Sequence, residues 1–375
     1  MLWILLILGA TLFVAYANGA NDNFKGVATL FGSGTADYRK ALWWATVTTL
    51  AGSLAAFFLA TKLISIYQGK GMVPVSLAES QPFVAAVILS AALTVFSAAK
   101  IGVPISTTHS LTGAMVGSGF VALGTGIGFA TLLKSFFLPL LVSPLIAVAV
   151  ALVAYPVLIH GLRFAGLTKE NCICIGNEMV PVSVTPGGYS MAQASTGLRV
   201  LVDERTECAQ RLGGTLCGVN AQSVIDAGHF LSAGAVSFAR GLNDTPKIVA
   251  LSLVAGTLDF GWSISLIALV MALGGLLSAR KVAETVSKRI TAMEPDQGFI
   301  ANLLTSFLVI VASKWGMPVS TTHVSCGALF GIGIANGQAH WSVIRTILLA
   351  WILTLPIAGV TAGLIYGILS RLTMG

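Results

Sequence analysis

The sequence predicts an all-α polytopic membrane protein built from two homologous repeats, and three observations support this fold class. Hydrophobic residues make up 55% of the 375 residues and charged residues only 9%, whereas soluble domains contain about 25% charged residues. The apolar runs are long and do not alternate between polar and apolar residues, which favours membrane helices over a β-barrel. Two polar motifs each occur twice, in the same order, among these apolar runs.

The apolar segments divide the chain into a first membrane repeat (1–162), a polar central loop (163–211) and a second membrane repeat (212–375). The first segment has no basic residues at its start and continues directly into a polar motif, so we interpret it as folded structure and not as a signal peptide. Several segments are shorter than the roughly 20 residues of a membrane-spanning helix, so we interpret them as half-helices or re-entrant arms. The segments lie at about 1–20, 24–35, 41–61, 83–99, 110–130, 135–160, 214–239, 246–256, 260–278, 298–313, 324–337 and 341–370.

Basic residues are concentrated outside these segments. The formal net charge is +7, from 21 Lys and Arg against 14 Asp and Glu. In a membrane protein this excess is typical of basic cytoplasmic loops and not of nucleic-acid binding. The central loop and the stretch from Arg280 to Arg289 both carry basic clusters, so the positive-inside rule places both on the cytoplasmic side. That placement requires an even number of membrane crossings between them.

Four of the five cysteines lie in or just after the central loop. The spacing of Cys172 and Cys174, with Cys208 and Cys217 further on, allows a metal site. Reduced thiols in a cytoplasmic loop are the interpretation we favour, because the spacings form no convincing framework and cytoplasmic cysteines are kept reduced.

The stretch 100–109, KIGVPISTTH, recurs as 314–323, KWGMPVSTTH. Pro104 and Pro318 prevent a continuous helix at these points. In each copy one apolar residue and then a Ser-Thr-Thr run follow the proline. Irregular polar backbone at membrane depth is tolerated only where protein buries it or where it lines a cavity. Matching interruptions in two halves of a membrane protein indicate the binding site of a transporter.

A second motif supports the two-repeat organisation. The residues Gly19–Lys25, GANDNFK, recur as Gly241–Lys247, GLNDTPK. The offset between copies is 222 residues for this motif and 214 for the hydroxyl-containing motif. Two motifs that recur in the same order at nearly the same offset indicate an internal duplication. Parallel and inverted arrangements of the repeats would give the same sequence pattern.

The motif copies GANDNFKG, GLNDTPKI, GVPISTTH and GMPVSTTH resemble the paired signatures of the inorganic phosphate transporter family of the Pit type. The resemblance covers both repeats but not the central loop. It implies inverted repeats, broken helices and two re-entrant helical hairpins, with transport coupled to sodium ions or protons. It also implies that the Asn-Asp motifs and the Ser-Thr-Thr hairpins meet near the membrane centre and hold the coupling ions and the phosphate.

Two aspartates are the candidate coupling-ion ligands. Asp22 and Asp244 lie in apolar surroundings, where an ionised carboxylate is costly and usually functional. Together with Asn21 and Asn243 they offer the oxygen ligands that a hard cation prefers, so we expect both aspartates to ligate sodium. The alternative is that each aspartate caps a broken helix. Pro246 would fit the first turn of a half-helix that begins near Asp244.

Six hydroxyl residues are the candidate substrate ligands. If helices begin at Thr107 and Thr321, their free N–H groups and dipoles form an anion site that suits a tetrahedral oxyanion. Alternatively the hydroxyls only satisfy the broken backbone, but the duplication favours contact with the anion. The six residues are Ser106, Thr107, Thr108, Ser320, Thr321 and Thr322.

Lys25 and Lys247 depart from the family pattern, which has a further Asn at this position. Each follows its aspartate by three residues, so an ion pair within one helix is one interpretation. The other is that both lysines belong to the substrate site and supply fixed positive charge near the anion. Fixed charge would reduce the need for sodium, so the variant signature could mark a sulfate or oxyanion permease branch.

Four further polar residues flank the hydroxyls. Lys100 and Lys314 begin the two motifs, and we favour extension to the membrane interface over steering of anions. His109 and His323 follow the hydroxyls, and we favour hydrogen bonding at the hairpin tip over a proton relay.

The sequence therefore predicts a secondary active transporter of inorganic phosphate, coupled to Na⁺ or H⁺ and working by alternating access. The first alternative is a permease of the same fold for sulfate or another tetrahedral oxyanion, and an anion channel or a receptor on this scaffold is less favoured. No P-loop, HExxH or GxSxG motif is present, so neither an enzyme nor a cofactor beyond the coupling ion is expected. The expected partners are phosphate or sulfate and the lipid bilayer, with homo-oligomer formation left open, in a prokaryotic plasma (inner) membrane.

Overall fold

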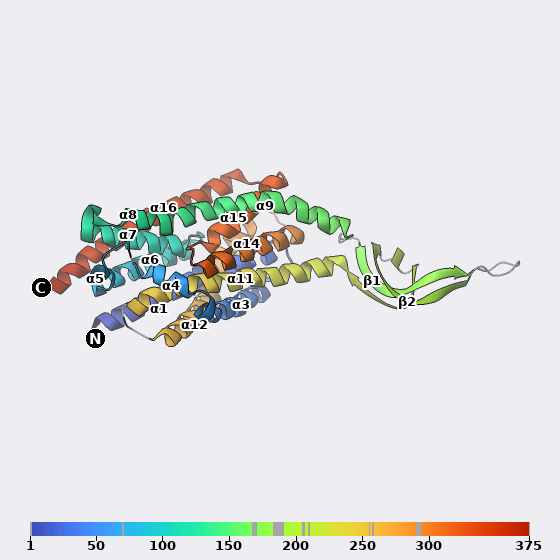
Figure 1. Cartoon of the computed structure of the whole chain (residues 1–375), viewed down its shortest axis with the longest axis horizontal. Helices are drawn as coiled ribbons and strands as arrows, with labels where there is room; N and C mark the ends of the chain where they lie inside the picture. Colours follow the sequence, from blue (N-terminus) through green and yellow to red (C-terminus); the bar gives the residue numbers. More distant parts are fainter. Residues whose placement is uncertain are drawn as a thin grey trace.

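A computed structural model of the chain describes residues 2–69, 71–166, 171–182, 191–204, 207–208, 211–254, 256, 259–289 and 294–374. It is a bundle of long helices with a small β-sheet beyond one end, and both termini lie at the opposite end (Figure 1). Seven described helices are long and apolar enough to cross a membrane. The predicted all-α polytopic membrane fold is therefore confirmed.

The elements fall into two helical halves separated by the sheet. The first half contains α1 (Leu2–Asp22), η1 (Asn23–Val27), α2 (Ala28–Gly32), α3 (Tyr38–Leu59), α4 (Thr61–Tyr67), α5 (Val75–Ala78), α6 (Gln81–Ile101), α7 (Thr107–Leu123), η2 (Gly124–Gly126), α8 (Phe129–Thr131), η3 (Leu132–Phe137) and α9 (Leu138–Phe164). The sheet contains β1 (Asn171–Val182), β2 (Met191–Glu204) and β3 (Leu212–Asn220). The second half contains α11 (Ala221–Val254), α12 (Phe260–Ser278), α13 (Arg280–Arg289), α14 (Pro295–Trp315), α15 (Thr321–Ala335) and α16 (Trp341–Met374).

Two helix–loop–helix units contain the repeated hydroxyl motif. α6 ends at Gly102 and α14 ends at Gly316, and both glycines adopt the left-handed conformation (φ 78° and 77°) that favours glycine at a helix C-terminus. A short non-helical stretch follows, and α7 and α15 then begin at Thr107 and Thr321, as the sequence predicts. We call α6–α7 hairpin 1 and α14–α15 hairpin 2.

The first arm of each hairpin is longer than its apolar segment. α6 and α14 each contain 21 residues and are long enough to cross a membrane, whereas their apolar segments at 83–99 and 298–313 are short. Polar residues before each segment extend the helix, because Pro82 and Pro295 occupy first-turn positions where a missing N–H costs no hydrogen bond. These two segments are therefore full-length helices and not half-helices, and their alternative interpretation as re-entrant arms stays a prediction, while α7 and α15 are shorter.

α11 also differs from its predicted form. It continues through Pro246, so no half-helix begins near Asp244, and that prediction was wrong. In the first half the chain does break, since α1 ends at Asp22 and the 3₁₀-helix η1 follows. A proline inside a helix removes one backbone hydrogen bond. Every residue from 239 to 252 is buried, so close packing around α11 holds the helix together across this defect.

The central loop and the nine residues after it form a three-stranded antiparallel sheet in the order β2-β1-β3, which the sequence analysis did not predict. β3 covers 212–220, so the apolar segment expected from about 214 begins in a strand and becomes helical only at Ala221. The side chains of Cys172, Cys174 and Cys208 are buried together with Leu212, and that of Cys217 lies outside the described residues. Within the described ranges no group of three His, Cys, Asp or Glu side chains is arranged to hold a metal ion. α11 and α12 lie between the sheet and the basic helix α13. α12 is among the helices long and apolar enough to cross a membrane, and α11 is not, so the shared cytoplasmic placement stays a prediction.

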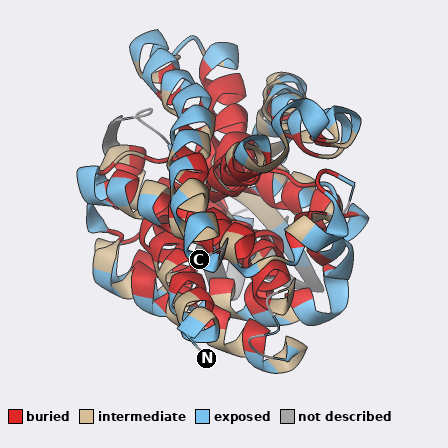
Figure 2. Cartoon of the chain, turned by 90° about the vertical axis from the view of Figure 1, so that its left-hand side faces the viewer, coloured by how far each residue is buried: buried red, intermediate tan, exposed pale blue. Residues whose placement is uncertain are grey.

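The two halves pack against each other reciprocally. α1 packs against α12 while α11 packs against α3, and α7 packs against α16 while α15 packs against α9. α1 runs from the terminal end of the bundle toward the sheet, whereas α11 runs from the sheet back toward that end (Figure 1). Buried residues lie along the inner faces of these helices and exposed residues along the outer faces (Figure 2). Each helix therefore packs against the counterpart of a neighbouring helix in the other half, and the same pairing occurs twice.

Candidate functional site

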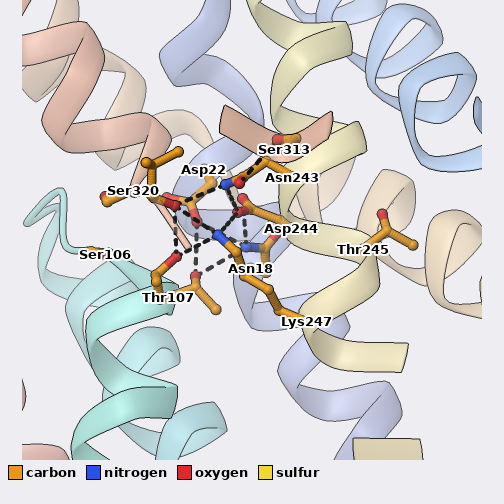
Figure 3. Close-up of polar contacts among 12 residues, drawn as sticks. Asn18, Asp22, Ser106, Thr107, Asn243, Asp244, Thr245, Lys247, Ser313 and Ser320 are labelled. Atoms are coloured by element: carbon orange, nitrogen blue, oxygen red, sulfur yellow. Dashed lines mark hydrogen bonds and ion pairs between the residues drawn. The ribbon is translucent and has the colours of Figure 1, made fainter. Parts of the chain in front are cut away.

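A buried polar network lies where α1, α11 and the N-termini of α7 and α15 meet (Figure 3). Its centre consists of two carboxylates, Asp22 from α1 and Asp244 from α11. Neither aspartate caps a helix with its side chain: Asp22 precedes η1 without a capping hydrogen bond, and Asp244 lies inside α11. The helix-capping interpretation of both aspartates was therefore wrong.

Donors surround both carboxylates. Oδ1 of Asp22 accepts from Nζ of Lys25, and its Oδ2 accepts from Oγ1 of Thr107 at 2.8 Å. Oδ1 of Asp244 accepts from Nζ of Lys247 at 3.2 Å. The amide of Asn18 joins the two carboxylates, because its Nδ2 lies 2.9 Å from Oδ2 of Asp22 and 3.3 Å from Oδ2 of Asp244. The two aspartates thus share one amide donor across the boundary between the halves.

Each lysine contacts both halves of the protein. Nζ of Lys25, from the first half, donates to Oγ1 of Thr322 in hairpin 2 at 2.9 Å. Nζ of Lys247, from the second half, donates to Oγ1 of Thr108 in hairpin 1 at 2.7 Å. Each ammonium also donates to a carbonyl of its own half, Ile105 at 2.6 Å for Lys25 and Val319 at 2.8 Å for Lys247. We call this reciprocal arrangement the crossed lysine network.

The ion-pair interpretation of the lysines is confirmed, and the interpretation that they belong to the substrate site stays a prediction. Each lysine forms the predicted ion pair at spacing i, i+3 and at the same time contacts a hairpin hydroxyl of the opposite half. Lys25 is 7% exposed and Lys247 1%. Two ammonium groups compensate two carboxylates here, so the charges within this network sum to zero.

The asparagines of the repeated motif hold the hairpin loops in place. Nδ2 of Asn21 donates to the carbonyl of Val103 at 3.0 Å. In the other half, Nδ2 of Asn243 donates to the carbonyl of Val319 at 3.0 Å, and its Oδ1 accepts from Oγ of Ser313 at 3.2 Å. Both asparagine side chains thus tie a hairpin loop to the helix that carries the aspartate.

The two hairpin helices begin with the same cap. Oγ of Ser106 accepts from the backbone N–H of His109 at 3.2 Å, and Oγ of Ser320 accepts from that of His323 at 3.3 Å. Serine at this position satisfies one of the N–H groups that a helix N-terminus leaves free. The backbone N–H groups of the first turn stay near the positive end of the helix dipole. Two buried helix N-termini therefore lie at the network.

The oxygens of the two carboxylates are all occupied by donors. Asp22 accepts from three side chains and Asp244 from three, counting Asn243 and the shared Asn18. A carboxylate has about four acceptor sites, so a sodium ion at these carboxylates would compete with these donors for the same oxygens. The lysine ammonium groups lie directly beside the aspartates.

The remaining flanking residues lie outside the network or support it. Lys100 and Lys314 are exposed, and Nζ of Lys100 lies 5.0 Å from the ring centroid of Phe96. The rings of His109 and His323 face each other with centroids 4.2 Å apart, and Nδ1 of His109 lies 3.2 Å from Oγ of Ser106. His109 thus makes the predicted contact at the hairpin start, whereas neither ring nitrogen of His323 has a hydrogen-bond partner among the described residues, so the prediction was wrong for His323. Lys100 and Lys314 do not reach the network.

The structure adds two residues that the sequence analysis missed. Asn18 and Arg240 each lie four residues before the aspartate of their half, and both are buried. A charged residue such as Arg240 inside an apolar segment is itself a sign of function. The same offset of 222 residues that relates the two Asn-Asp motifs relates these two positions, so extending the motif comparison by one helical turn would have found both.

Replacing either threonine hydroxyl that accepts a hydrogen bond from a network lysine should lower the free energy of unfolding by the same amount. We expect Thr108→Val and Thr322→Val each to lower the free energy of unfolding by about 1.5–3 kcal/mol, because each removes a hydrogen bond to a charged group. The measurement is melting of the purified protein in detergent. Thr11→Val is the control, since the Thr11 hydroxyl is equally buried but bonds only the carbonyl of Ile7 in its own helix. A large effect at one threonine and none at the other would contradict the crossed arrangement.

Comparisons with known proteins agree with this architecture. The model of the phosphate transporter family matches residues 18–362. A candidate phosphate permease of Pyrococcus horikoshii is 28% identical over 404 residues, which cover 98% of each chain. Inorganic phosphate transporter 2-1, chloroplastic, of Arabidopsis thaliana is 28% identical over 426 residues, covering 94% of this chain and 70% of the relative.

The fold is also similar to a solved structure. The sodium-dependent phosphate transporter superposes with a TM-score of 0.76 at 20% sequence identity, covering 99% of this chain and 100% of that one. At this identity the similarity concerns the fold. The family match, in contrast, extends through both Asn-Asp motifs, both hairpins and most of the sequence between and beyond them. This membrane protein therefore belongs to the phosphate transporter family.

Proposed function

We propose that this chain is a secondary active transporter of inorganic phosphate, coupled to Na⁺ or H⁺, that holds the anion between hairpins 1 and 2. The observation that carries this proposal is the convergence of two buried helix N-termini, one from each half, on the crossed lysine network. Helix N-termini bind anions through free N–H groups and the helix dipole. The relatives named as phosphate transporters support phosphate as the substrate.

The hydroxyl residues are the proposed ligands of the anion. Ser106 and Ser320 set the start of each helix, and the first-turn residues Thr107 and Thr321 follow directly. A tetrahedral oxyanion has four oxygens, so it can accept hydrogen bonds from the N-termini of α7 and α15 at the same time. The crossed lysine network compensates the aspartates and keeps the net charge beside the anion from becoming negative, which would otherwise repel it.

Alternating access is the proposed mechanism. The hydroxyl, aspartate and lysine side chains of the site are each at most 8% exposed, so an anion reaches them only when one hairpin moves. Each cross-half hydrogen bond from a lysine joins one hairpin to the opposite half. Opening either side then breaks one of two equivalent contacts. The opposite directions of α1 and α11 (Figure 1) support inverted repeats, which supply two such equivalent states.

Coupling ions are proposed to act at Asn21, Asp22, Asn243 and Asp244. Because each carboxylate already accepts from three donors, a sodium ion that binds there competes with a lysine or amide donor, and a proton acts by neutralising one aspartate. Either event weakens the ion pair between a lysine and the aspartate of its own half. This links occupation of the cation site to release of a hairpin contact.

Uptake into proteoliposomes tests the function. Radiolabelled phosphate should accumulate when a sodium or proton gradient is imposed separately, and unlabelled phosphate on the far side should accelerate the exchange. Sulfate uptake that phosphate fails to compete would assign the site to another oxyanion. Flux without exchange acceleration would instead identify a channel, and binding without flux a receptor.

A further inference from the structure

Arg240 is a buried cation that the proposed function leaves without a role. It lies on α11, one helical turn before Asp244, and its side chain is 1% exposed. None of its three guanidinium nitrogens has a hydrogen-bond partner among the described residues. Burial of an unpaired charge is costly. A guanidinium in this position is therefore expected to gain a partner in some state of the protein.

The two halves carry different residues at the position of Arg240. Its counterpart in the first half is Asn18, at the same offset of 222 residues. Asn18 uses its amide to bridge Asp22, Asp244 and Thr107. Arg240 makes no such bridge, although Asp244 and Asp22 are the acidic groups that act on it electrostatically. The second half thus places a positive charge beside the network where the first half places a neutral amide.

Counting donors separates Arg240 from the two lysines. A lysine ammonium has three N–H groups, and Lys25 faces four acceptors while Lys247 faces three. Neither lysine has a donor left for a substrate unless one of these bonds breaks. A guanidinium carries five N–H donors, and those of Arg240 are unused within the described part of the chain.

Counting charges gives the same result. The two lysines cancel the two aspartates, so the crossed lysine network alone offers an anion no net attraction. Arg240 adds one positive charge, and the buried groups then sum to +1. A planar guanidinium pairs two N–H groups with two oxygens of a phosphate or sulfate.

We propose that Arg240 binds the transported oxyanion directly, with two guanidinium N–H groups donating to two oxygens of a tetrahedral anion. This inference rests on the proposed function and adds to it the residue that supplies free donors and net charge. The lysines compensate the aspartates, and the arginine compensates the substrate. Bound phosphate supplies the hydrogen-bond acceptors that the Arg240 guanidinium lacks among the described residues.

The test uses the full-length protein in proteoliposomes and in detergent. Arg240→Asn introduces the residue of the equivalent position in the first half, Arg240→Lys keeps the charge but loses the paired donors, and exposed Arg345→Asn is the control. We expect Arg240→Asn to raise the KM for phosphate about 10- to 100-fold, the loss typical of a hydrogen bond to a charged group. The KM of Arg240→Lys should lie between that of Arg240→Asn and that of the wild type, and Arg345→Asn should leave the KM unchanged.

Melting in detergent distinguishes binding from a structural role. Because Arg240→Asn removes an unpaired buried charge, the anion-free variant should melt no lower than the wild type, and added phosphate should no longer raise its melting temperature. An unchanged KM, or a lower melting temperature with the phosphate-induced rise intact, would overturn the inference. If the wild type takes up neither phosphate nor sulfate, the proposed function is wrong, and the phosphate-induced melting shift still decides whether Arg240 binds the anion.

Discussion

Replacing either network lysine by methionine is expected to abolish phosphate uptake and to lower the free energy of unfolding by about 3–5 kcal/mol. Each ammonium is the compensating charge of one buried carboxylate, Asp22 for Lys25 and Asp244 for Lys247. Removing it leaves that carboxylate unpaired in a low-dielectric interior. Thermal melting in detergent and radiolabelled phosphate uptake measure the two effects. The two lysines should behave alike because their contacts are equivalent.

A paired variant separates folding from transport. Asp22→Asn combined with Lys25→Met removes both charges at once, so stability should return close to that of the wild type while uptake stays lost. Lys62→Met is the control, since Lys62 is an exposed lysine on α4. Wild-type uptake by the paired variant would show that this charge pair is structural and has no part in anion transport.

Substituting alanine for Gly19 or Gly241 should prevent stable folding of the protein. A Cβ at Gly19 would contact the backbone of Met271 on α12, and a Cβ at Gly241 would contact the backbone of Thr49 on α3. Backbone atoms cannot rotate away, so the helices must separate. We expect a loss of at least about 3 kcal/mol, at the upper end of what overpacking costs. Yield after membrane extraction and melting temperature are the measurements.

The control lies on the same helix as Gly19. A Cβ at Gly9 has no atom within 4 Å, so Gly9→Ala should leave stability unchanged or raise it slightly, because alanine favours helices by about 1 kcal/mol over glycine. If Gly19→Ala melted like Gly9→Ala, the close approach of α1 and α12 would be wrong. The two glycines would then not define how the halves pack.

The sequence was sufficient to predict the parts of the site that local chemistry determines. Ser106 and Ser320 are favourable helix caps after a proline-containing loop, and the helices do begin at the next residue. Lys25 and Lys247 lie three residues after an aspartate, and both ion pairs form. Duplication of both motifs predicted the two helical halves.

Features that depend on tertiary contacts were not predictable in the same way. The path of α11 through Pro246 depends on packing from neighbouring helices, which a local rule for proline does not include. The crossing of Lys25 to Thr322 joins residues 297 positions apart, and no local pattern specifies it. The sheet of the central loop likewise pairs strands by register, which polar composition does not reveal.

The charge arrangement gives this site a specific character. Two lysine–aspartate pairs balance the charges at its centre. In the binding mode we propose, helix N-termini and Arg240 therefore compensate the charge of the anion. Discrimination between phosphate and sulfate then depends on hydrogen bonding. Phosphate carries a proton that needs an acceptor, and sulfate at neutral pH does not.

The location of the bound anion tests the central claim most directly. Arsenate is a tetrahedral analogue of phosphate whose arsenic atom scatters anomalously, so crystals grown with arsenate report its position. We predict one anomalous peak at the N-termini of α7 and α15, beside Arg240 and between Thr108 and Thr322. A peak distant from both hairpins, in protein that takes up phosphate, would contradict the account.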